Sequence, residues 1–229
     1  MTPTQIPMLR VEFHSHTMYS KDSLARPERL LSACRRKGID RLVVTDHNTI
    51  AGAMQCQELD PERVIIGEEI LTQSGEILAA FVQEHIPARL TAQETIAHLR
   101  AQGAFISVSH PFDITRKGHW QLAQLLEIAP LVDAIETFNA RCFLPSFNTQ
   151  AQDFAHQQKL LGTAGSDAHT TYELGRATML MPDFHDAESF KTALTQAQFE
   201  TSLSSPWIHL SSRYATWVKK MQRKRSQNR

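Results

Sequence analysis

Short apolar runs alternate along the chain with longer amphipathic segments. Runs with the length and composition of buried strands occupy residues 9–13, 41–45, 63–66, 104–109, 132–138, 160–164 and 176–181. Apolar residues at helical spacing occupy residues 26–37, 51–59, 91–102, 120–128, 149–159 and 189–197. Residues 69–82 predict a β-hairpin that turns at Gln73, Ser74 and Gly75. The pattern therefore predicts repeated strand–helix units.

Local signals indicate where several of these helices begin and end. Thr91 and Glu94 have the spacing of a capping box, which predicts that a helix begins there. Gly38 and Gly103 occupy positions where a left-handed residue commonly follows a helix. Asp186 is expected to cap the helix that follows it.

Six or seven strand–helix alternations predict an α/β fold with a mainly parallel sheet. A barrel of eight full units usually needs about 250 residues, whereas this chain has 229. We therefore expect a distorted barrel of seven (β/α) units, with its chemistry at the carboxyl ends of the strands. No linker or repeat divides the body, so we expect one domain over residues 1–210 and a basic tail or helix over residues 211–229.

Charge is distributed unevenly between the body and the C-terminus. The chain carries 24 basic and 24 acidic residues, but residues 219–229 hold six of the basic ones and no acidic one. Residues 1–218 therefore have a net charge of −6. A basic segment of this kind can bind phosphate backbones without sequence preference. Nucleic acid is thus one candidate partner, although we favour a solvated C-terminus.

Composition limits the class of protein further. A hydrophobic content of 41% and a charged content of 21% are typical of globular domains. No apolar run approaches the length of a membrane span, and the first ten residues lack the apolar core of a secretory signal. We therefore expect a cytoplasmic protein that makes no membrane contact. Cys34, Cys56 and Cys142 are too few and too scattered for a disulfide framework or a zinc finger.

Histidine is the residue type that points to chemistry. Five of the eleven histidines come at or just after the ends of predicted strands, namely His14, His16, His47, His110 and His169. Carboxylates occupy similar positions: Asp22, Asp46, Glu68 or Glu69, Glu136 and Asp167. Because the strands of such a barrel end at one rim, we expect these side chains to converge there. The other six histidines are expected to lie on the surface.

The spacing of these residues favours metal binding. Alternate strand residues point to the same face, so His14 and His16 can hold one ion together. Asp167 and His169 repeat this spacing with one oxygen and one nitrogen ligand. Imidazole and carboxylate together suit ions such as Zn, Mn or Fe(II). The set exceeds the needs of one ion, so we expect two ions, or three, that share bridging carboxylates.

The motifs formed by these residues resemble the polymerase-and-histidinol-phosphatase (PHP) family. They are F-H-S-H-T-x-x-S-x-D-S (13–23), T-D-H-N (45–48), G-E-E-I (67–70), S-H-P-F (109–112), I-E-T-F-N-A-R (135–141) and G-S-D-A-H (165–169). They come in the family's order and cover roughly residues 10–210. The resemblance implies a distorted seven-stranded barrel that binds two or three divalent metal ions, often Mn, Zn or Fe. It also implies hydrolysis of phosphoesters, such as small phosphomonoesters, nucleotides or nucleic-acid ends.

Matched motif by motif, the resemblance also implies the ligands. They are His14, His16, Asp22, His47, Glu69, His110, Asp167 and His169. Family members with three metals usually supply one more histidine in the segment that matches residues 135–147, where this chain has none. Asn139 is the nearest coordinating substitute. The fork-shaped side chains of Arg141 and Arg176 are near motif loops and are expected to bind substrate phosphate, with Arg116 as a weaker candidate.

The expected chemistry is metal-assisted hydrolysis. A water that bridges two ions would lose a proton near neutral pH and attack phosphorus in line. Glu69 is expected to bridge the ions, and His110 or Asp167 to help move protons.

Two alternatives compete with this interpretation. An amidohydrolase also begins with H-x-H on its first strand, but it normally has a longer chain and often a bridging lysine after a middle strand, and no lysine here ends a predicted strand. A PHP-like module could instead have lost its activity and serve only to bind or regulate a partner. Measured metal content would separate the latter from an enzyme, because an inactive module should purify with little metal.

Overall fold

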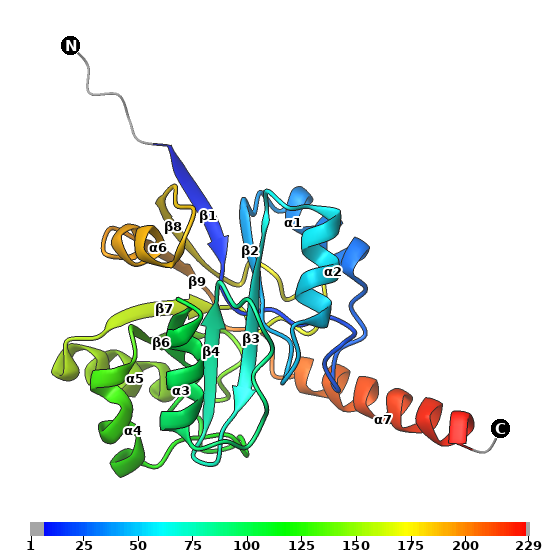
Figure 1. The fold of residues 1–229 in the computed structure, drawn as a ribbon. Helices are drawn as coiled ribbons and strands as arrows, with labels where there is room; N and C mark the ends of the chain where they lie inside the picture. The colour runs from blue at the N-terminus through cyan, green and yellow to red at the C-terminus, as the bar shows by residue number, and fades with distance from the viewer. Residues whose placement is uncertain (1–6, 228–229) are drawn as a thin grey trace.

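A computed structural model describes residues 7–227, in which nine strands form one sheet with the order β7-β6-β5-β4-β3-β2-β1-β8-β9 (Figure 1). The strands are β1 (Met8–Glu12), β2 (Arg41–Val44), β3 (Val64–Leu71), β4 (Glu76–Ala80), β5 (Phe105–Val108), β6 (Ala134–Asn139), β7 (Leu161–Gly165), β8 (Ala177–Pro182) and β9 (Gln198–Thr201). The helices are α1 (Pro27–Arg36), α2 (Ala51–Leu59), α3 (Ala92–Ala101), α4 (Leu122–Ile128), η1 (Ala129–Leu131), α5 (Pro145–Gln158), α6 (Ala187–Leu194) and α7 (Ile208–Gln227). Residues 1–6, part of the N-terminal segment expected to lack the apolar core of a secretory signal, and Arg229, the last basic residue of the tail, lie outside the described residues.

The sheet curls so that its edge strand β7 approaches β1. The segment after β7 pairs in parallel with the segment after β1 through Ser15 and Ala168. The backbone N–H of His16 donates to Ala168 O at 2.8 Å, and the N–H of Ala168 donates to His14 O at 3.2 Å. This closure confirms the predicted α/β fold with a distorted barrel, and it joins the two segments that carry the H-x-H and D-x-H pairs.

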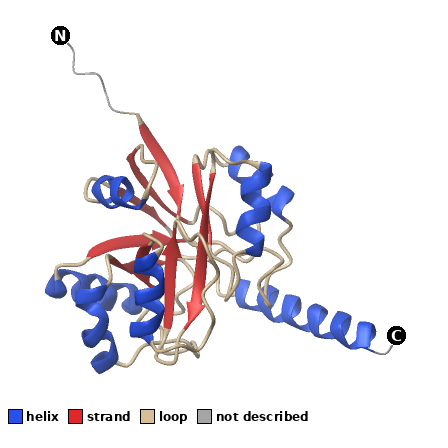
Figure 2. Ribbon diagram, viewed as in Figure 1, coloured by secondary structure: helices blue, strands red, loops and turns tan. Residues whose placement is uncertain are grey.

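Helices cover the outside of this sheet (Figure 2). Figure 1 shows α1 and α2 on the side of β2 and β3, with α3, α4 and α5 gathered on the side of β4 to β7. Helix α7 projects away from the body at its C-terminal end (Figure 1). No helix among residues 7–227 combines the length and the apolar character needed to cross a membrane.

The sheet is less parallel than the strand–helix pattern predicts. Four of its eight strand pairs are antiparallel: β3–β4, β4–β5, β1–β8 and β8–β9. The predicted hairpin accounts for the first pair, since the hydroxyl of Thr72 accepts from the N–H groups of Ser74 and Gly75 and turns the chain tightly. Strand β8 returns beside β1 without a helix between β7 and β8, which permits only a reversed direction.

Most predicted helix ends are confirmed. Thr91 and Glu94 form a full capping box, and Asp186 caps α6. Gly38 and Gly103 have positive φ angles of 63° and 71° after their helices. The helix predicted over residues 149–159 begins earlier, at Pro145, because a proline is well suited to the first position of a helix.

A cluster of aromatic rings fills the barrel beneath the strand ends. Phe13 packs against Phe105 and Phe190, with ring centroids 5.8 and 5.5 Å apart. Phe190 of α6 also meets Phe105 at 4.7 Å and Phe184 at 4.9 Å. Since Phe13 directly precedes His14, this packing holds the end of β1 in the core while the next residue faces the rim.

Candidate metal centre

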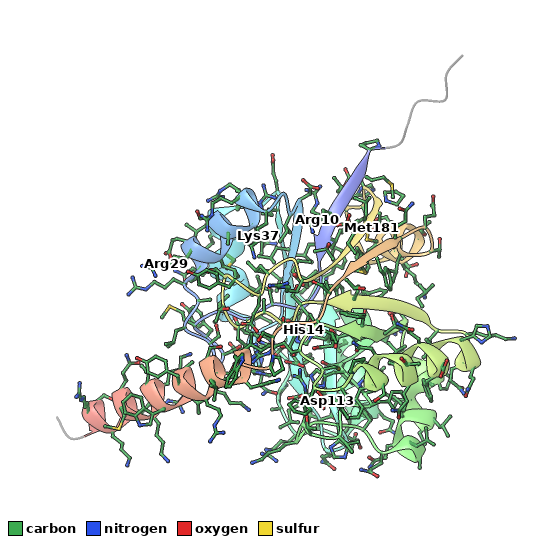
Figure 3. All side chains as sticks on the ribbon, turned by 180° about the vertical axis from the view of Figure 1, so that it is seen from behind. Arg10, His14, Arg29, Lys37, Asp113 and Met181 are labelled. Atoms are coloured by element: carbon green, nitrogen blue, oxygen red, sulfur yellow. The ribbon has the colours of Figure 1, made fainter. Side chains whose placement is uncertain are left out.

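All eight side chains that the motifs imply as metal ligands converge at one end of the barrel. They are His14, His16, Asp22, His47, Glu69, His110, Asp167 and His169, joined by a network of nitrogen–oxygen contacts. Figure 3 shows His14 near the middle of the molecule. The side chains of His14, His16, Glu69 and Asp167 are fully buried.

The sheet explains this convergence. His14 and His16 follow β1, His110 follows β5, and Asp167 follows β7. His47, after β2, pairs with Glu69 of β3 through an isolated parallel bridge. Strand alternation turns the neighbouring Glu68 to the other side, where its carboxylate lies 2.7 Å from His85 Nδ1. The preference for Glu69 over Glu68 therefore agrees with the direction in which each side chain points.

Four atoms of this network form a tight cage: His14 Nε2, His16 Nε2, Glu69 Oε2 and Asp167 Oδ1. The two nitrogens are 3.1 Å apart. From His14 Nε2, the distances to the Glu69 and Asp167 oxygens are 3.4 and 3.5 Å. From His16 Nε2, they are 3.4 and 3.2 Å.

The nitrogen–nitrogen and nitrogen–oxygen distances of the cage match those between neighbouring ligands of one metal ion. Ligand bonds of about 2.0–2.2 Å to zinc imply ligand–ligand edges of about 3.3–3.6 Å, close to the distances above. Glu69 Oε2 and Asp167 Oδ1 are buried without any hydrogen-bond partner. Buried carboxylates of this kind are stable only when a cation neutralises them. The donor set and its geometry therefore fit a divalent ion.

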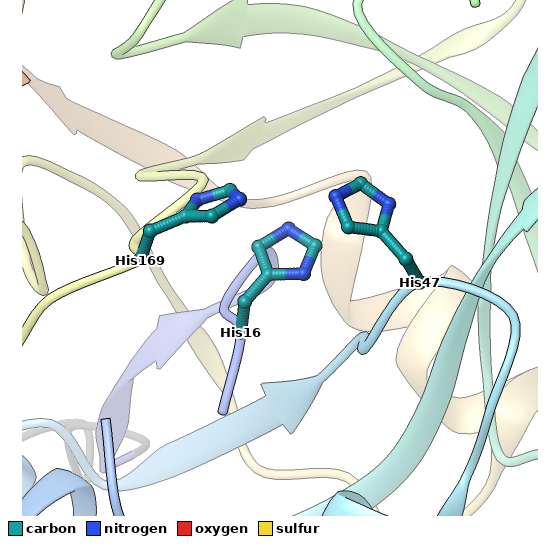
Figure 4. Close-up of side chains that lie close together, drawn as sticks. All are labelled: His16, His47 and His169. Carbon is teal, nitrogen blue, oxygen red and sulfur yellow. The ribbon is translucent and has the colours of Figure 1, made fainter. Parts of the chain in front are cut away.

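A second group of donors lies beside the cage. Figure 4 shows the imidazoles of His16, His47 and His169 close together, with His16 in the middle. The ring centroid of His16 is 4.5 Å from that of His47 and 4.1 Å from that of His169. Asp22 Oδ2 lies 3.5 Å from His47 Nε2 and 3.3 Å from His169 Nε2. The three imidazoles offer nitrogen atoms close enough together to hold another ion, with the Asp22 carboxylate beside them.

A third group includes a residue that the motifs do not indicate. Glu76, at the start of β4, lies with Oε2 3.5 Å from His110 Nε2 and with Oε1 3.9 Å from His47 Nδ1. Glu69 reaches the same two histidines, at 3.0 Å in each case. Glu69 therefore contacts all three groups of donors. Glu76 could not be predicted from the sequence, because it starts the return strand of the hairpin and belongs to no recognised motif.

Neighbouring side chains orient the ligands. Glu136 Oε1 lies 2.9 Å from His14 Nδ1, which directs the other nitrogen of the ring into the cage. Asp46 accepts hydrogen bonds from Thr17 and Ser20, and Ser20 Oγ lies 3.1 Å from His16 Nδ1. Asp46 therefore orients His16 through Ser20.

The backbone at the rim is held in unusual conformations. His110 and Asp167 have positive φ angles of 21° and 51°, which non-glycine residues seldom adopt and which cluster at functional sites. A Cβ atom at Gly165 would lie 2.3 Å from Cβ of His14 and 2.8 Å from Oε1 of Glu136. Only glycine at this position allows β7 to approach His14 so closely.

The charges of the cluster act strongly on one another. Burial alone would lower the pKa of His14, but the carboxylates of Asp167 and Glu136 outweigh it and raise that pKa well above its ordinary value. The pKa of His16 is lowered, by burial and then by the charges of His169 and His47. Burial would raise the pKa of Asp167, yet Arg116 and His14 hold it well below the usual range.

Burial would likewise raise the pKa of Glu69, but His14 and His47 keep that pKa well below the ordinary value. The pKa of Asp22 is also lowered: burial would raise it, but the charge of His169 has the larger opposing effect together with that of His47. These carboxylates are therefore ionised at neutral pH and available as ligands.

Arg116 was expected only as the weaker candidate for phosphate binding, but it lies in direct contact with the cluster. Its guanidinium lies 2.6 Å from Asp167 Oδ2 and 3.1 Å from Asp113 Oδ2. Asn139 lies beside it, with its amide nitrogen 3.3 Å from Asp167 Oδ2 and its oxygen accepting from the N–H of Arg141 at 2.8 Å. The oxygen that would have to coordinate a metal is thus engaged by the backbone.

A cavity of about 430 Å³ opens onto the cluster. Asp22, His47, Glu76 and His169 are among the residues that line it. The cations around it are Lys21, Arg116, Lys117, Arg141 and Arg213. A cavity with metal-binding groups at its base and cations around them suits a small anionic group.

The two arginines expected to bind phosphate lie in different surroundings. Arg141 lines the cavity, where Glu173 Oε1 lies 3.3 Å from its Nε and Ser212 Oγ accepts from its Nη2 at 2.8 Å. Arg176 is exposed and is not among the residues that line the cavity. His209 was expected on the surface. It lines the cavity because it lies in the first turn of α7, which begins beside the cavity.

Comparisons with known proteins agree with this geometry. The PHP domain family matches residues 12–129, and a PHP-associated family matches residues 145–199. An uncharacterised protein of Methanocaldococcus jannaschii, MJ0417, is 34% identical over 172 residues, which cover 74% of this chain and 69% of that protein.

Solved structures share the fold at lower sequence identity. A two-domain protein from Bacteroides vulgatus, which contains a predicted PHP-like metal-dependent phosphoesterase, superposes with a TM-score of 0.69 at 18% identity over 86% of this chain. This chain spans 65% of the length of that protein. PsfC from Pseudomonas syringae superposes with a TM-score of 0.68 at 20% identity, covering 93% of this chain and all of PsfC. These likenesses show that the fold is of the PHP type.

The contact between Glu136 and His14 leads to a prediction about metal affinity. Glu136→Gln should weaken binding of the metal held by the cage by about 10- to 100-fold, because the amide no longer fixes the ring with a charged acceptor. Competition with a chromophoric chelator measures this affinity. Glu68→Gln, which changes a buried carboxylate on the other side of β3, is the matched control. Equal metal affinities in Glu136→Gln and the unaltered protein would contradict the orienting role.

Proposed function

This chain belongs to the PHP family, and from that membership and its site we propose that it hydrolyses phosphoesters with the help of bound divalent metal ions. The observation that carries the proposal is the buried cage of two imidazoles and two unpartnered carboxylate oxygens beside a cavity surrounded by cations. The substrates that fit are a phosphomonoester, a nucleotide or the phosphorylated end of a nucleic acid.

The residues that would hold the metals fall into the three groups described above. His14, His16, Glu69 and Asp167 form the cage. Asp22, His47 and His169 form the second group, with His16 beside them. Bound Zn, Mn or Fe ions would supply Lewis acidity, lower the pKa of a water molecule and neutralise phosphoryl oxygens.

Family members with three metals usually have one more histidine in the segment that matches residues 135–147, and this chain has none there. We propose that Glu76 is the ligand that takes its place. It shares His47 and His110 with Glu69, and its carboxylate is largely buried. Asn139 is a poorer candidate because its oxygen accepts from the N–H of Arg141. A carboxylate at this position favours hard ions such as Mn or Fe(II) in the third group.

Other residues would bind and orient the substrate. Arg116 and Arg141 both line the cavity, and a guanidinium can contact two phosphoryl oxygens at once. Glu173 and Ser212 hold Arg141 in place, and Asp113 and Asp167 hold Arg116. Arg176, on the exposed surface, has no comparable position, so we assign phosphate binding to the other two.

Three residues were expected to take part in the chemistry, and their contacts suggest distinct roles. Glu69 touches every group of ligands and is proposed to bridge them. Asp167 has one oxygen in the cage and the other on Arg116, so both are occupied. His110 retains a ring nitrogen, Nδ1, without a partner. We therefore assign proton exchange to His110 rather than to Asp167.

The geometry also bears on the two alternatives. In the part of the chain that the structure describes, no lysine forms an ion pair with a carboxylate of the cluster, whereas an amidohydrolase often has a bridging lysine. A module that only binds a partner would have no need to bury carboxylates without partners around a cavity. Both observations favour metal-dependent phosphoester hydrolysis.

The first test combines metal content with activity. The purified protein should contain at least about two equivalents of transition metal, and it should hydrolyse at least one member of a panel of phosphomonoesters, nucleotides and nucleic-acid ends. His14→Ala and Asp167→Asn should each lose metal and at least about 100-fold in kcat, while His156→Ala, exposed on α5, should retain both. Hydrolysis that survives complete removal of metal would contradict the proposal.

A second test addresses Glu76. Glu76→Gln should lower the metal content by about one equivalent, because a neutral amide is a weaker ligand than a carboxylate. Elemental analysis after dialysis measures this change, and Glu84→Gln, on the exposed surface, is the control. An unchanged metal content in Glu76→Gln would show that Glu76 is not a ligand.

A further inference from the structure

Helix α7 attaches to the metal-bearing end of the barrel by its first half. Ala215 is buried against the body, and Ser212 Oγ accepts from Arg141 Nη2 at 2.8 Å. The ammonium group of Lys219 donates to the backbone oxygens of Met18 and Ser20, in the loop that follows His16. Beyond this point α7 extends away from the body (Figure 1).

One face of α7 continues the lining of the cavity. His209, Arg213 and Thr216 line the cavity on successive turns. Lys220 and Lys224 follow Arg213 at intervals of seven and four residues, so they lie on the same face of the helix. Both lysines are exposed. A row of cations therefore leads outward from the mouth of the cavity.

A second row, of apolar side chains, runs beside the first. Trp207, Leu210, Tyr214, Trp217 and Met221 recur every three or four residues. They are 77%, 53%, 60%, 59% and 39% exposed. The rings of Tyr214 and Trp217 are neighbours, with centroids 6.0 Å apart and planes inclined by 30°. A row of exposed apolar side chains on one helix face marks an interaction surface.

The charge of α7 decides what this surface can bind. The chain has no acidic residue after Glu200, whereas α7 itself carries six lysines and arginines. A second copy would bring the same cations to the contact, which opposes pairing of the helices. An anionic partner with aromatic groups can contact both rows. Its negative charges would pair with the lysines, and its aromatic groups would stack on the aromatic side chains.

From this arrangement we infer that α7 binds a single-stranded nucleic acid whose end enters the cavity. The inference rests on the proposed function, because it makes the cavity the place where the strand is hydrolysed. From Arg213 to Lys224 the helix rises about 17 Å, which spans about five nucleotides at the about 3.4 Å spacing of stacked bases. Phosphates would contact Arg213, Lys220 and Lys224, and bases would stack on Tyr214 and Trp217.

Binding is tested with the full-length protein as purified and a fluorescein-labelled decathymidylate whose phosphorothioate linkages resist hydrolysis. Fluorescence anisotropy measures its Kd over a range of salt concentrations. Lys220→Ala combined with Lys224→Ala should weaken binding about tenfold and reduce the slope of log K against log salt by about 1.4, for two lost phosphate contacts. Trp217→Ala should weaken binding about tenfold without changing the slope. Arg35→Ala combined with Arg36→Ala on α1 is the control and should match the unaltered protein.

Three outcomes would overturn the inference. One is an equal Kd for the oligonucleotide in the lysine double variant, the α1 control and the unaltered protein. Another is binding to vesicles that contain phosphatidylserine with no binding to the oligonucleotide, which would identify a membrane surface. The last is a dimer in light scattering that Trp217→Ala dissociates, again with no oligonucleotide binding.

Kinetics separate this inference from the proposed function. The lysine double variant should raise KM about tenfold for an oligonucleotide with an end phosphate and leave kcat and KM unchanged for p-nitrophenyl phosphate. Failure of the proposed function would appear instead as no hydrolysis of any phosphoester by the unaltered protein, whatever its affinity for the oligonucleotide.

Discussion

The burial of Glu69 among four histidines is the interaction on which the rest of the site depends. This fully buried carboxylate lies within 3.4 Å of nitrogens of His14, His16, His47 and His110. Burial alone would raise its pKa, and only the surrounding positive charge keeps the pKa low. The imidazoles and carboxylates gathered around it supply the nitrogen and oxygen donors that a divalent cation needs.

Several features of the fold serve this cluster. The parallel pairing of Ser15 with Ala168 brings the first and last ligand segments together. Gly165 leaves room for His14 and Glu136, and the positive φ angles of His110 and Asp167 turn their side chains toward the centre. The rigid aromatic packing below Phe13 gives the rim a firm base. Conformations that are costly locally are thus tolerated where the ligands require them.

Much of this arrangement could be predicted from sequence, because strand ends of a barrel converge and a pair of histidines two residues apart must share a face. The eight motif residues do meet in the structure, and Glu69 rather than Glu68 points inward. The prediction was weaker for contacts made by residues outside the strand ends. Glu76 lies on a return strand, and Arg116 reaches the site from a loop, so neither position follows from local spacing.

The same reason applies to the start of α7. Charge composition alone suggests a solvated tail, and only tertiary structure shows that His209 and Arg213 line the cavity. Strand β9 was not predicted because its four residues are all exposed and lack an apolar alternation. Antiparallel pairing of β8 likewise depends on the path of the chain and not on the strand's own sequence.

The central claim is that the cage of His14, His16, Glu69 and Asp167 binds a metal ion. Anomalous diffraction from crystals of the purified protein, recorded on both sides of the zinc, iron and manganese absorption edges, tests it directly. We expect an anomalous peak about 2.0–2.2 Å from the four ligand atoms. Two results would contradict the account in crystals grown with these metals. One is the absence of anomalous density in the cage, and the other is density for a lysine side chain or a water network where the metal is expected.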